Sequence, residues 1–259
     1  MVTNARPPAS AAAQPAGRPG ASASATTTAT ATATATASST GRPVRPAAGR
    51  TAALLVAGAV LVNVAFLGLG TAFDYPDVLN QPPVDVLIRF HANQVLIGSL
   101  FLLLAAGAAL LAPIAVAVSR LGDGRALRAS RIVGITAAAV QVAGLLRWPL
   151  VVPFLAGEAP TASAARTFQT LNLVLGTTVG ETLGYALTAA WTVLVCLGLR
   201  RSVLGRALTA IGLLAAALIA VGTVEPLVPI AGLANFVGYV VWSVWLVAFA
   251  VVLLRRRTS

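Results

Sequence analysis

The sequence predicts an all-α protein: a polytopic membrane bundle of six transmembrane helices that follows a disordered N-terminal tail. Three observations indicate this class. The chain of 259 residues is 58% hydrophobic and 10% charged, whereas a soluble domain needs a more highly charged surface. Its apolar residues gather in six runs, each about long enough to cross a bilayer. All 18 basic residues are arginine, and most of them lie between those runs.

The first 49 residues form a separate low-complexity segment. They are mainly Ala, Thr, Pro, Gly and Ser, and they include an alternating Ala-Thr tract at 28–37. Such a segment cannot bury enough apolar area to offset its ordering entropy. It also lacks the charged-then-apolar pattern of a cleaved signal peptide. We therefore expect residues 1–49 to be a disordered cytoplasmic tail and residues 50–259 to form the transmembrane domain.

Short polar segments separate the expected spans. Residues 119–130 and 156–171 are expected to be polar loops, and Arg200, Arg201 and Arg206 mark the turn after the fourth span. The expected spans are 51–73, 93–118, 133–155, 172–199, 207–224 and 234–254.

The segment between the first two spans, residues 74–94, is too polar to cross a membrane. Pro82-Pro83 can open a short helix, because the fixed φ of proline suits the first helical turn. Apolar residues then recur at every third position from Val84 to Phe90. This short helix is therefore expected to lie along the membrane interface.

The distribution of arginines predicts the orientation of the chain. Fifteen of the 18 lie in the tail, in the linker between spans two and three, in the turn after span four and at the C-terminus. The loops of the other side hold Arg89, Arg166 and most of the acidic residues. By the positive-inside rule, both termini are cytoplasmic and the protein resides in the inner (plasma) membrane. The predicted partner is the lipid bilayer, and the net charge of +11 therefore reflects topology and not nucleic-acid binding.

The fourth run, residues 172–199, carries an acidic residue, Glu181, inside an apolar segment. A carboxylate in hydrocarbon costs about 2.5–3.5 kcal/mol on insertion scales, so Glu181 should face other helices, be protonated or meet a cation. Gly176, Gly180 and Gly184 share one helical face, where a neighbouring backbone can approach closely. Two interpretations stay open: a glycine-packed structural helix, or a carboxyl group that handles protons or cations.

Arg147 is the one arginine that falls within an expected span. Counted along the helix rise, Arg147 and Glu181 lie at a similar depth, about 12 to 14 Å from the same surface. Consecutive spans that are joined by a short loop are usually neighbours. We therefore predict that the two side chains lie within ion-pair or water-bridged reach, which lowers the cost of burying each charge.

The candidate functional residues form an outward-facing polar cluster. His91, the one histidine, has either a structural interfacial role or a role as proton relay or ligand. The sequence shows no phosphate-binding loop and no metal-binding motif, and Cys196 is its one cysteine. No catalytic residue, metal or cofactor is therefore predicted. The cluster comprises Asp74, Asp77, Arg89, His91, Arg147 and Glu181.

Four short phrases of the chain combine charged, aromatic and glycine residues, and they are Phe73–Asp77 with Arg89-Phe90, Arg147–Pro149, Gly180–Tyr185 and Asn235–Tyr239. In these phrases the chain resembles the bacterial six-span membrane proteins of domain-of-unknown-function family 4386. The likeness covers about residues 50 to 255. It implies an integral membrane protein and supplies no activity, substrate or catalytic residue.

Three functions are compatible with these patterns. The first is a structural or interaction protein of the membrane, which a closed, dry bundle around Glu181 would favour. The second is a small solute or proton-coupled transporter that uses Glu181 and Arg147, which a water-filled cavity reaching Glu181 from one side would favour. The third is an enzyme or sensor with a pocket near His91, at the outer ends of spans two to four. Spans that are broken in mid-membrane, as many transporters have, are not evident.

Overall fold

The structure, a computed structural model, describes residues 44–258. Most of the expected N-terminal tail therefore lies outside the described residues. Within 44–258 every regular element is a helix, and the elements are α1 (Val44–Phe73), η1 (Asp77–Asn80), α2 (Pro83–Ala92), α3 (Gln94–Ala109), α4 (Leu111–Ser119), α5 (Arg125–Leu150), η2 (Val152–Phe154), α6 (Ala162–Leu171), η3 (Asn172–Leu183), α7 (Gly184–Leu199), η4 (Arg200–Leu204), α8 (Gly205–Val221), η5 (Gly222–Val224) and α9 (Ala231–Thr258).

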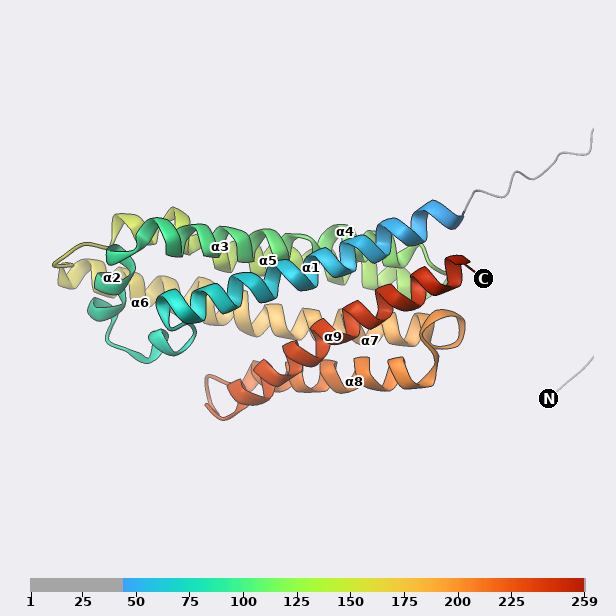
Figure 1. The fold of residues 1–259 in the computed structure, drawn as a ribbon. Helices are drawn as coiled ribbons and strands as arrows, with labels where there is room; N and C mark the ends of the chain where they lie inside the picture. The colour runs from blue at the N-terminus through green and yellow to red at the C-terminus, as the bar shows by residue number, and fades with distance from the viewer. Residues whose placement is uncertain (1–43, 259) are drawn as a thin grey trace, which may run out of the picture. The chain divides into compact units, whose positions relative to one another are not determined.

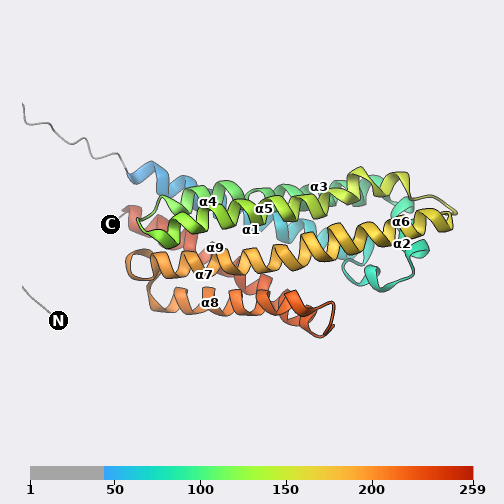
Figure 2. The ribbon, with the colours of Figure 1, turned by 180° about the vertical axis from the view of Figure 1, so that it is seen from behind.

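The long helices of residues 44–258 pack side by side as a bundle. Contacts run from α1 to α3, from α3 and α4 to α5, from α5 to η3 and α7, and then through α8 and α9 back to α1. Figure 1 shows α2 and α6 together at one end, which we call the loop end. The start of α1, the end of α9 and the turns after α4 and α7 lie at the other, the terminal end; Figure 2 shows the same ends from behind.

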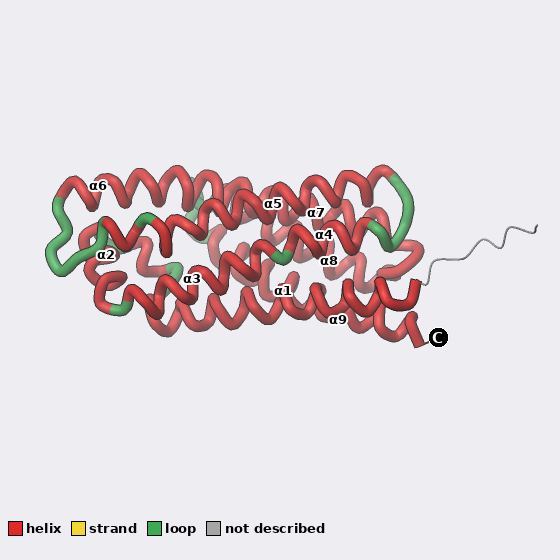
Figure 3. Tube along the Cα trace, turned by 90° about the horizontal axis from the view of Figure 1, so that it is seen from above, coloured by secondary structure: helices red, strands yellow, loops and turns green. Residues whose placement is uncertain are grey.

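In the described part of the chain, five helices are long and apolar enough to cross a membrane. The fourth of them covers 63 residues, Ala162–Val224. It folds back on itself at Gly205, where φ is +69°, so that α8 lies beside α7 (Figure 3). Glycine suits this turn because it has no Cβ to oppose a positive φ. Large apolar side chains such as Leu67, Val95 and Ile132 point outward, as expected of helices that face lipid.

Two segments that were expected to be polar loops are partly helical, so this prediction was wrong. Helix α5 begins at Arg125, and α6 occupies much of the segment 156–171. Thr161 caps α6 by accepting a hydrogen bond from the Ala164 N–H at 3.1 Å. One apolar residue on α6, Phe168, is buried. A cap and a single buried ring anchor a short polar helix that mean hydropathy does not reveal.

Two of the expected spans are irregular over part of their length, which the sequence did not make evident. The helix that contains α3 and α4 is interrupted at Leu110, because Pro113 has no N–H to donate to the preceding turn. The segment η3 is π-helical over 12 residues. Within it the Thr178 hydroxyl donates to the Leu173 carbonyl, five residues earlier, at 2.9 Å. π-helical turns are rare and often mark functional segments.

The buried apolar residues fall into two clusters. The terminal cluster surrounds Trp191 and Trp245 and draws on α1, α4, α5 and α7 to α9. The loop cluster surrounds Trp148 and draws on α1 to α3, α5 and α6. In the loop cluster the indole of Trp148 stacks on the Phe101 ring, with the two centroids 4.6 Å apart. The candidate site lies beside this second cluster.

Candidate functional site

Arg147 is a buried cation in the last turns of α5. Its side chain is 4% exposed. One terminal nitrogen donates to the Gly144 carbonyl, and the other donates to Asn172 Oδ1 at 2.9 Å. The guanidinium lies 5.3 Å from the centre of the Trp148 ring. Neutral acceptors and an aromatic ring, and not a carboxylate, therefore hold this charge.

The expected direct ion pair between Arg147 and Glu181 is not formed. Within residues 44–258 no carboxylate lies within 4.0 Å of the Arg147 guanidinium. Glu181 is half-buried on η3, and its carboxylate instead lies in hydrogen-bonding reach of the Thr177 hydroxyl. The backbone carbonyl of Gly144 and the amide of Asn172 accept from the two terminal nitrogens of Arg147 instead. The water-bridged form of the pair stays a prediction.

A recess opens at the loop end between the start of α2 and the rod formed by α6 and η3. It has a volume of about 270 Å³. Two of its wall residues touch the buried charges: Asn172 accepts from Arg147, and Thr177 lies beside Glu181. The recess therefore reaches the immediate neighbours of both charges from one end of the bundle. Its lining residues are Leu79, Gln81, Pro83, Phe168, Gln169, Asn172, Leu173 and Thr177.

The other candidate residues are spread over the surface of the loop end. Asp74 and Arg89 form an ion pair at 3.7 Å, and both side chains are well exposed. Asp74 ends α1 with φ of +58°, a conformation that aspartate tolerates better than most residues. An exposed pair of this kind contributes at most about 1 kcal/mol. Asp77 and His91 are exposed and do not line the recess.

Tyr75 turns inward behind this exposed pair. Its ring packs edge-on against Phe66 and Phe101, with centroid distances of 5.8 and 5.3 Å. Burial, and after it the charge on Glu181, raises the pKa of the Tyr75 phenol above its ordinary value. The phenol is therefore a neutral hydrogen-bonding group close to Glu181.

The three glycines of the fourth run face α5. A Cβ on Gly176 would lie 2.6 Å from an Arg147 terminal nitrogen, and one on Gly184 would lie 2.9 Å from the Gln141 side chain. At Gly180 the backbones nearly touch, since a Cβ on Gly144 would lie 2.7 Å from the Gly180 Cα. The absence of side chains brings the two helices together and leaves room for the guanidinium.

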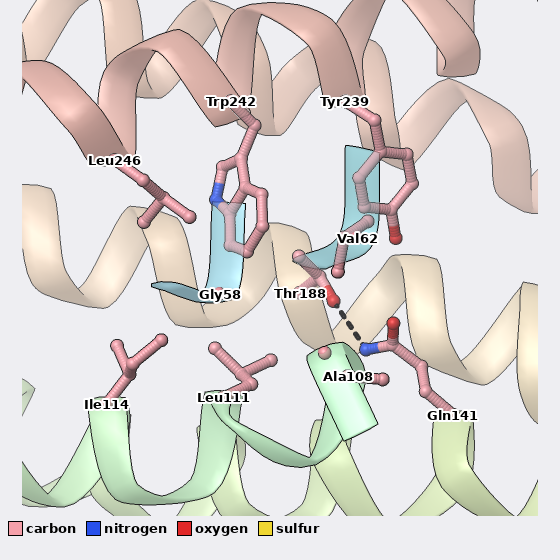
Figure 4. Close-up of a pocket in the computed structure, with 11 residues that line it drawn as sticks. Gly58, Val62, Ala108, Leu111, Ile114, Gln141, Thr188, Tyr239, Trp242 and Leu246 are labelled. Carbon is pink, nitrogen blue, oxygen red and sulfur yellow. Dashed lines mark hydrogen bonds between the residues drawn. The ribbon is translucent and has the colours of Figure 1, made fainter. Parts of the chain in front are cut away.

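A second, smaller cavity lies deeper, among α1, α3, α4, α5, α7 and α9 (Figure 4). We call it the central cavity; its volume is about 40 Å³, room for about two water molecules. Gln141 Nε2 donates to the Thr188 hydroxyl at 3.1 Å, and the Tyr239 phenol points toward the same two groups. Further toward the terminal end, the Trp242 indole donates to Thr192 at 2.8 Å. Beyond Thr192 the terminal cluster is apolar.

Sequence reasoning missed the residues that form the recess. Asn172 was taken as the first residue of a span, and Gln81 and Gln169 carried no signal of their own. The depth count did not pair Asn172 with Arg147, because Asn172 stood at the outer end of its expected span, nine residues before Glu181. Within residues 44–258 no group of three or more His, Cys, Asp or Glu is arranged to hold a metal ion. The arrangement can bind polar groups and carry charge.

The long apolar helices with lipid-facing side chains, and a pair of buried charges beside a recess, define a multi-pass integral membrane protein. The chain belongs to the family described as Domain of unknown function (DUF4386), whose model matches residues 51–250. The resemblance seen in the sequence is thereby confirmed. No curated protein and no solved structure matches the chain.

Proposed function

We propose that the chain crosses the plasma membrane of a bacterium six times, with both termini in the cytoplasm. The fold of α8 back along α7 supports the sixth crossing. The terminal end carries the arginines of the turns after α4 and α7 and those of the C-terminal segment. The positive-inside rule assigns such an end to the cytoplasm. The loop end and its recess then face outward.

Within this topology, the protein is a carrier that takes up a small polar solute from the outer side. The observation that carries this proposal is the recess, because its wall residue Asn172 accepts a hydrogen bond from the buried Arg147, and its wall residue Thr177 precedes the half-buried Glu181 by about one helical turn. A protein with a purely structural role has no need of two buried charges that a solvent-open cavity approaches. Ionisable groups inside membrane helices mark solute and ion pathways by default.

Two further features support a carrier. The small central cavity lies deeper in the bundle, and the hydrogen-bonded side chains of Gln141 and Thr188 are among the residues that line it. The π-helical η3 and the interruption at Leu110 are irregular backbone at membrane depth, which is tolerated where it is buried or lines a cavity. Such segments can change their hydrogen bonding during transport at little cost. An enzyme or sensor site near His91 is less well supported, because His91 lies outside the recess.

Thiol accessibility tests the open recess. In a background where the buried Cys196 is replaced by alanine, Thr177→Cys is compared with Thr192→Cys, whose parent residue is fully buried. A membrane-impermeant thiol reagent added outside intact cells is expected to label the cysteine at 177 and not the one at 192. Absence of labelling at 177 would favour the closed, structural bundle.

Tags test the topology. A protease-cleavable tag after Ser259 is expected to be protected in intact cells and cut after permeabilisation, whereas one inserted in the segment 156–161 is cut in both. Tags at the two chain ends that report opposite sides of the membrane would exclude an even number of crossings.

A further inference from the structure

We propose that the solute taken by the recess is a small oxyanion, a carboxylate or phosphate, and that the Arg147 guanidinium is the group that recognises it. This assignment rests on the proposed function, since it requires that the recess admits a solute. It goes beyond that function by naming the chemical class of the solute and the atom that selects it.

The charge balance around Arg147 carries the argument. The side chain is 4% exposed, yet within residues 44–258 no carboxylate approaches it within 4.0 Å. Its Nε has no hydrogen-bond partner in the described part of the chain. A buried charge with no carboxylate in direct contact is costly, since the more distant Glu181 offsets its desolvation only in part, and a buried donor without an acceptor adds to that cost. An arriving anion would relieve both costs at once.

The geometry gives an anion a short route to the guanidinium. One terminal nitrogen of Arg147 donates to Asn172 Oδ1 at 2.9 Å, and Asn172 is itself a wall residue of the recess. On the next turn, Gly176 presents no side chain between η3 and the guanidinium. The Asn172 amide oxygen therefore stands where a ligand oxygen would bind. Rotation of one amide side chain would let a carboxylate or phosphate replace a neutral acceptor with a charged one, which forms a stronger bond.

The remaining wall suits a small anion. It offers N–H and O–H donors from Gln81, Gln169 and Thr177, and no acidic residue belongs to its lining. Its volume of about 270 Å³ lies just below the range of about 300–1,000 Å³ that is usual for drug-sized ligands. Glu181 lies next to Thr177, and its negative charge repels an anion bound in the recess. Neutralising Glu181 should therefore strengthen anion binding.

The test is a titration of the full-length protein in nanodiscs of neutral phosphatidylcholine. The probes are acetate, inorganic phosphate and, as the uncharged isostere of acetate, acetamide. Intrinsic tryptophan fluorescence reports binding, because the guanidinium lies 5.3 Å from the Trp148 ring centre and the recess residue Phe168 lies 5.7 Å from it. We expect saturable binding of acetate or phosphate and at least roughly tenfold weaker binding of acetamide, as for loss of a charged hydrogen bond.

Three variants sharpen the test without removing the buried arginine. Asn172→Asp places an internal carboxylate on the guanidinium and should weaken anion binding roughly tenfold or more. Asn93→Asp adds the same charge at an exposed loop-end position away from the recess and should leave the affinity within about twofold. Glu181→Gln should tighten binding severalfold, a gain that damage to the fold would not produce.

The outcomes separate this inference from the function on which it rests. Labelling of Thr177→Cys with no binding of either anion, equal binding of acetamide, or an unchanged affinity in Asn172→Asp would overturn the oxyanion assignment and leave the open recess standing. Absence of labelling at 177 would remove the recess itself. Acetate that binds in phosphatidylcholine nanodiscs but not in phosphatidylglycerol nanodiscs would be displaced by the lipid phosphate. That result would support the oxyanion chemistry and identify a lipid headgroup as its source.

Discussion

The two ends of the bundle use tryptophan and glycine in opposite ways. At the terminal end the Trp191 indole lies on Gly134, and the Trp245 indole lies on Gly212 together with the thiol of Cys196. At the loop end, the group that lies on the η3 glycine Gly176 is the Arg147 guanidinium and not an aromatic ring. The missing side chain of a glycine therefore makes room for an indole ring at the terminal end and for a charged group at the loop end.

The indole N–H groups sharpen this contrast. Trp242 and Trp245, at the terminal end, donate to Thr192 and to the Leu208 carbonyl at 2.8 and 2.9 Å. Trp148 at the loop end has no acceptor in the described part of the chain, and neither does Arg147 Nε beside it. Trp191 is the exception at the terminal end, because its N–H also lacks an acceptor. The loop end thus combines unmet donors with a nearby recess, whereas at the terminal end two indoles are paired within a large apolar cluster.

The largest expected effect contrasts the same substitution at the two ends. Gly134→Ala puts a Cβ 2.5 Å from the Ala115 Cβ and 2.6 Å from the Trp191 ring, so we expect it to destabilise the fold by about 2–3 kcal/mol. Gly176→Ala meets the tip of Arg147 and lies 3.0 Å from Asn172 Oδ1, so it must shift a hydrogen-bonded side chain and should cost about 1–1.5 kcal/mol, less than the change at Gly134. Thermal unfolding in detergent measures both. Equal losses would mean that the guanidinium is held as rigidly as a core ring.

A double-mutant cycle tests what holds the buried arginine. Arg147→Gln combined with Asn172→Ala should show a coupling energy of about 1.5 kcal/mol or more, because the two side chains share a charged hydrogen bond. Arg147→Gln combined with Glu181→Gln should show a smaller coupling, because these side chains are not in direct contact. Unfolding free energies of the four variants in each cycle give both values. A larger coupling energy between Arg147 and Glu181 than between Arg147 and Asn172 would indicate a direct ion pair.

A buried hydroxyl tests the closed end. Thr192 accepts from the Trp242 indole, so Thr192→Val should cost about 1 kcal/mol. The matched change Thr136→Val removes a hydroxyl that bonds only its own helix, on a lipid-facing surface, and should cost less than about 0.5 kcal/mol. Unfolding midpoints of the two variants check the difference. Similar losses would show that the interhelical hydrogen bond adds little to the terminal end.

The smallest expected effect concerns Glu225, in the turn between α8 and α9. Burial raises the pKa of its carboxyl, because the charged form loses hydration in the fold. Below its ordinary pKa the group is protonated in both states and the shift has no effect. As the pH rises past that value, the folded state carries the cost of ionisation. Glu225→Gln should therefore raise the unfolding temperature slightly at pH 8 and leave it unchanged near pH 4; a uniform change across this range would assign the effect to packing.

Hydropathy and charge located the helices because both follow from the cost of placing backbone and charge in lipid. The fourth span was expected at 172–199, and η3 and α7 together cover those residues. Helix α6 was missed because a short polar helix leaves no hydropathy signal. The start of α5 at Arg125 was missed because the arginines there favoured a loop. Local capping and one buried ring decide such elements, and a composition average does not resolve them.

The candidate site was predicted only in part. Glu181 and Arg147 were singled out because isolated charges in apolar runs are conspicuous. The hydrogen bond from Arg147 to Asn172 could not be foreseen, since it depends on the helical phase of α5 against a π-helical segment. The recess likewise depends on how α2 sits against α6, a contact between two short helices far apart in sequence. Such packing is set by three-dimensional arrangement and not by residue type.

Hydrogen–deuterium exchange of the protein in nanodiscs tests most directly whether one end is open and the other sealed. The segments to compare are η3 and α7, which are consecutive parts of one rod. Because η3 borders the recess, its amides are expected to exchange at least about tenfold faster than those of α7, which packs in the terminal cluster. Equal protection along the whole rod would contradict an open loop end.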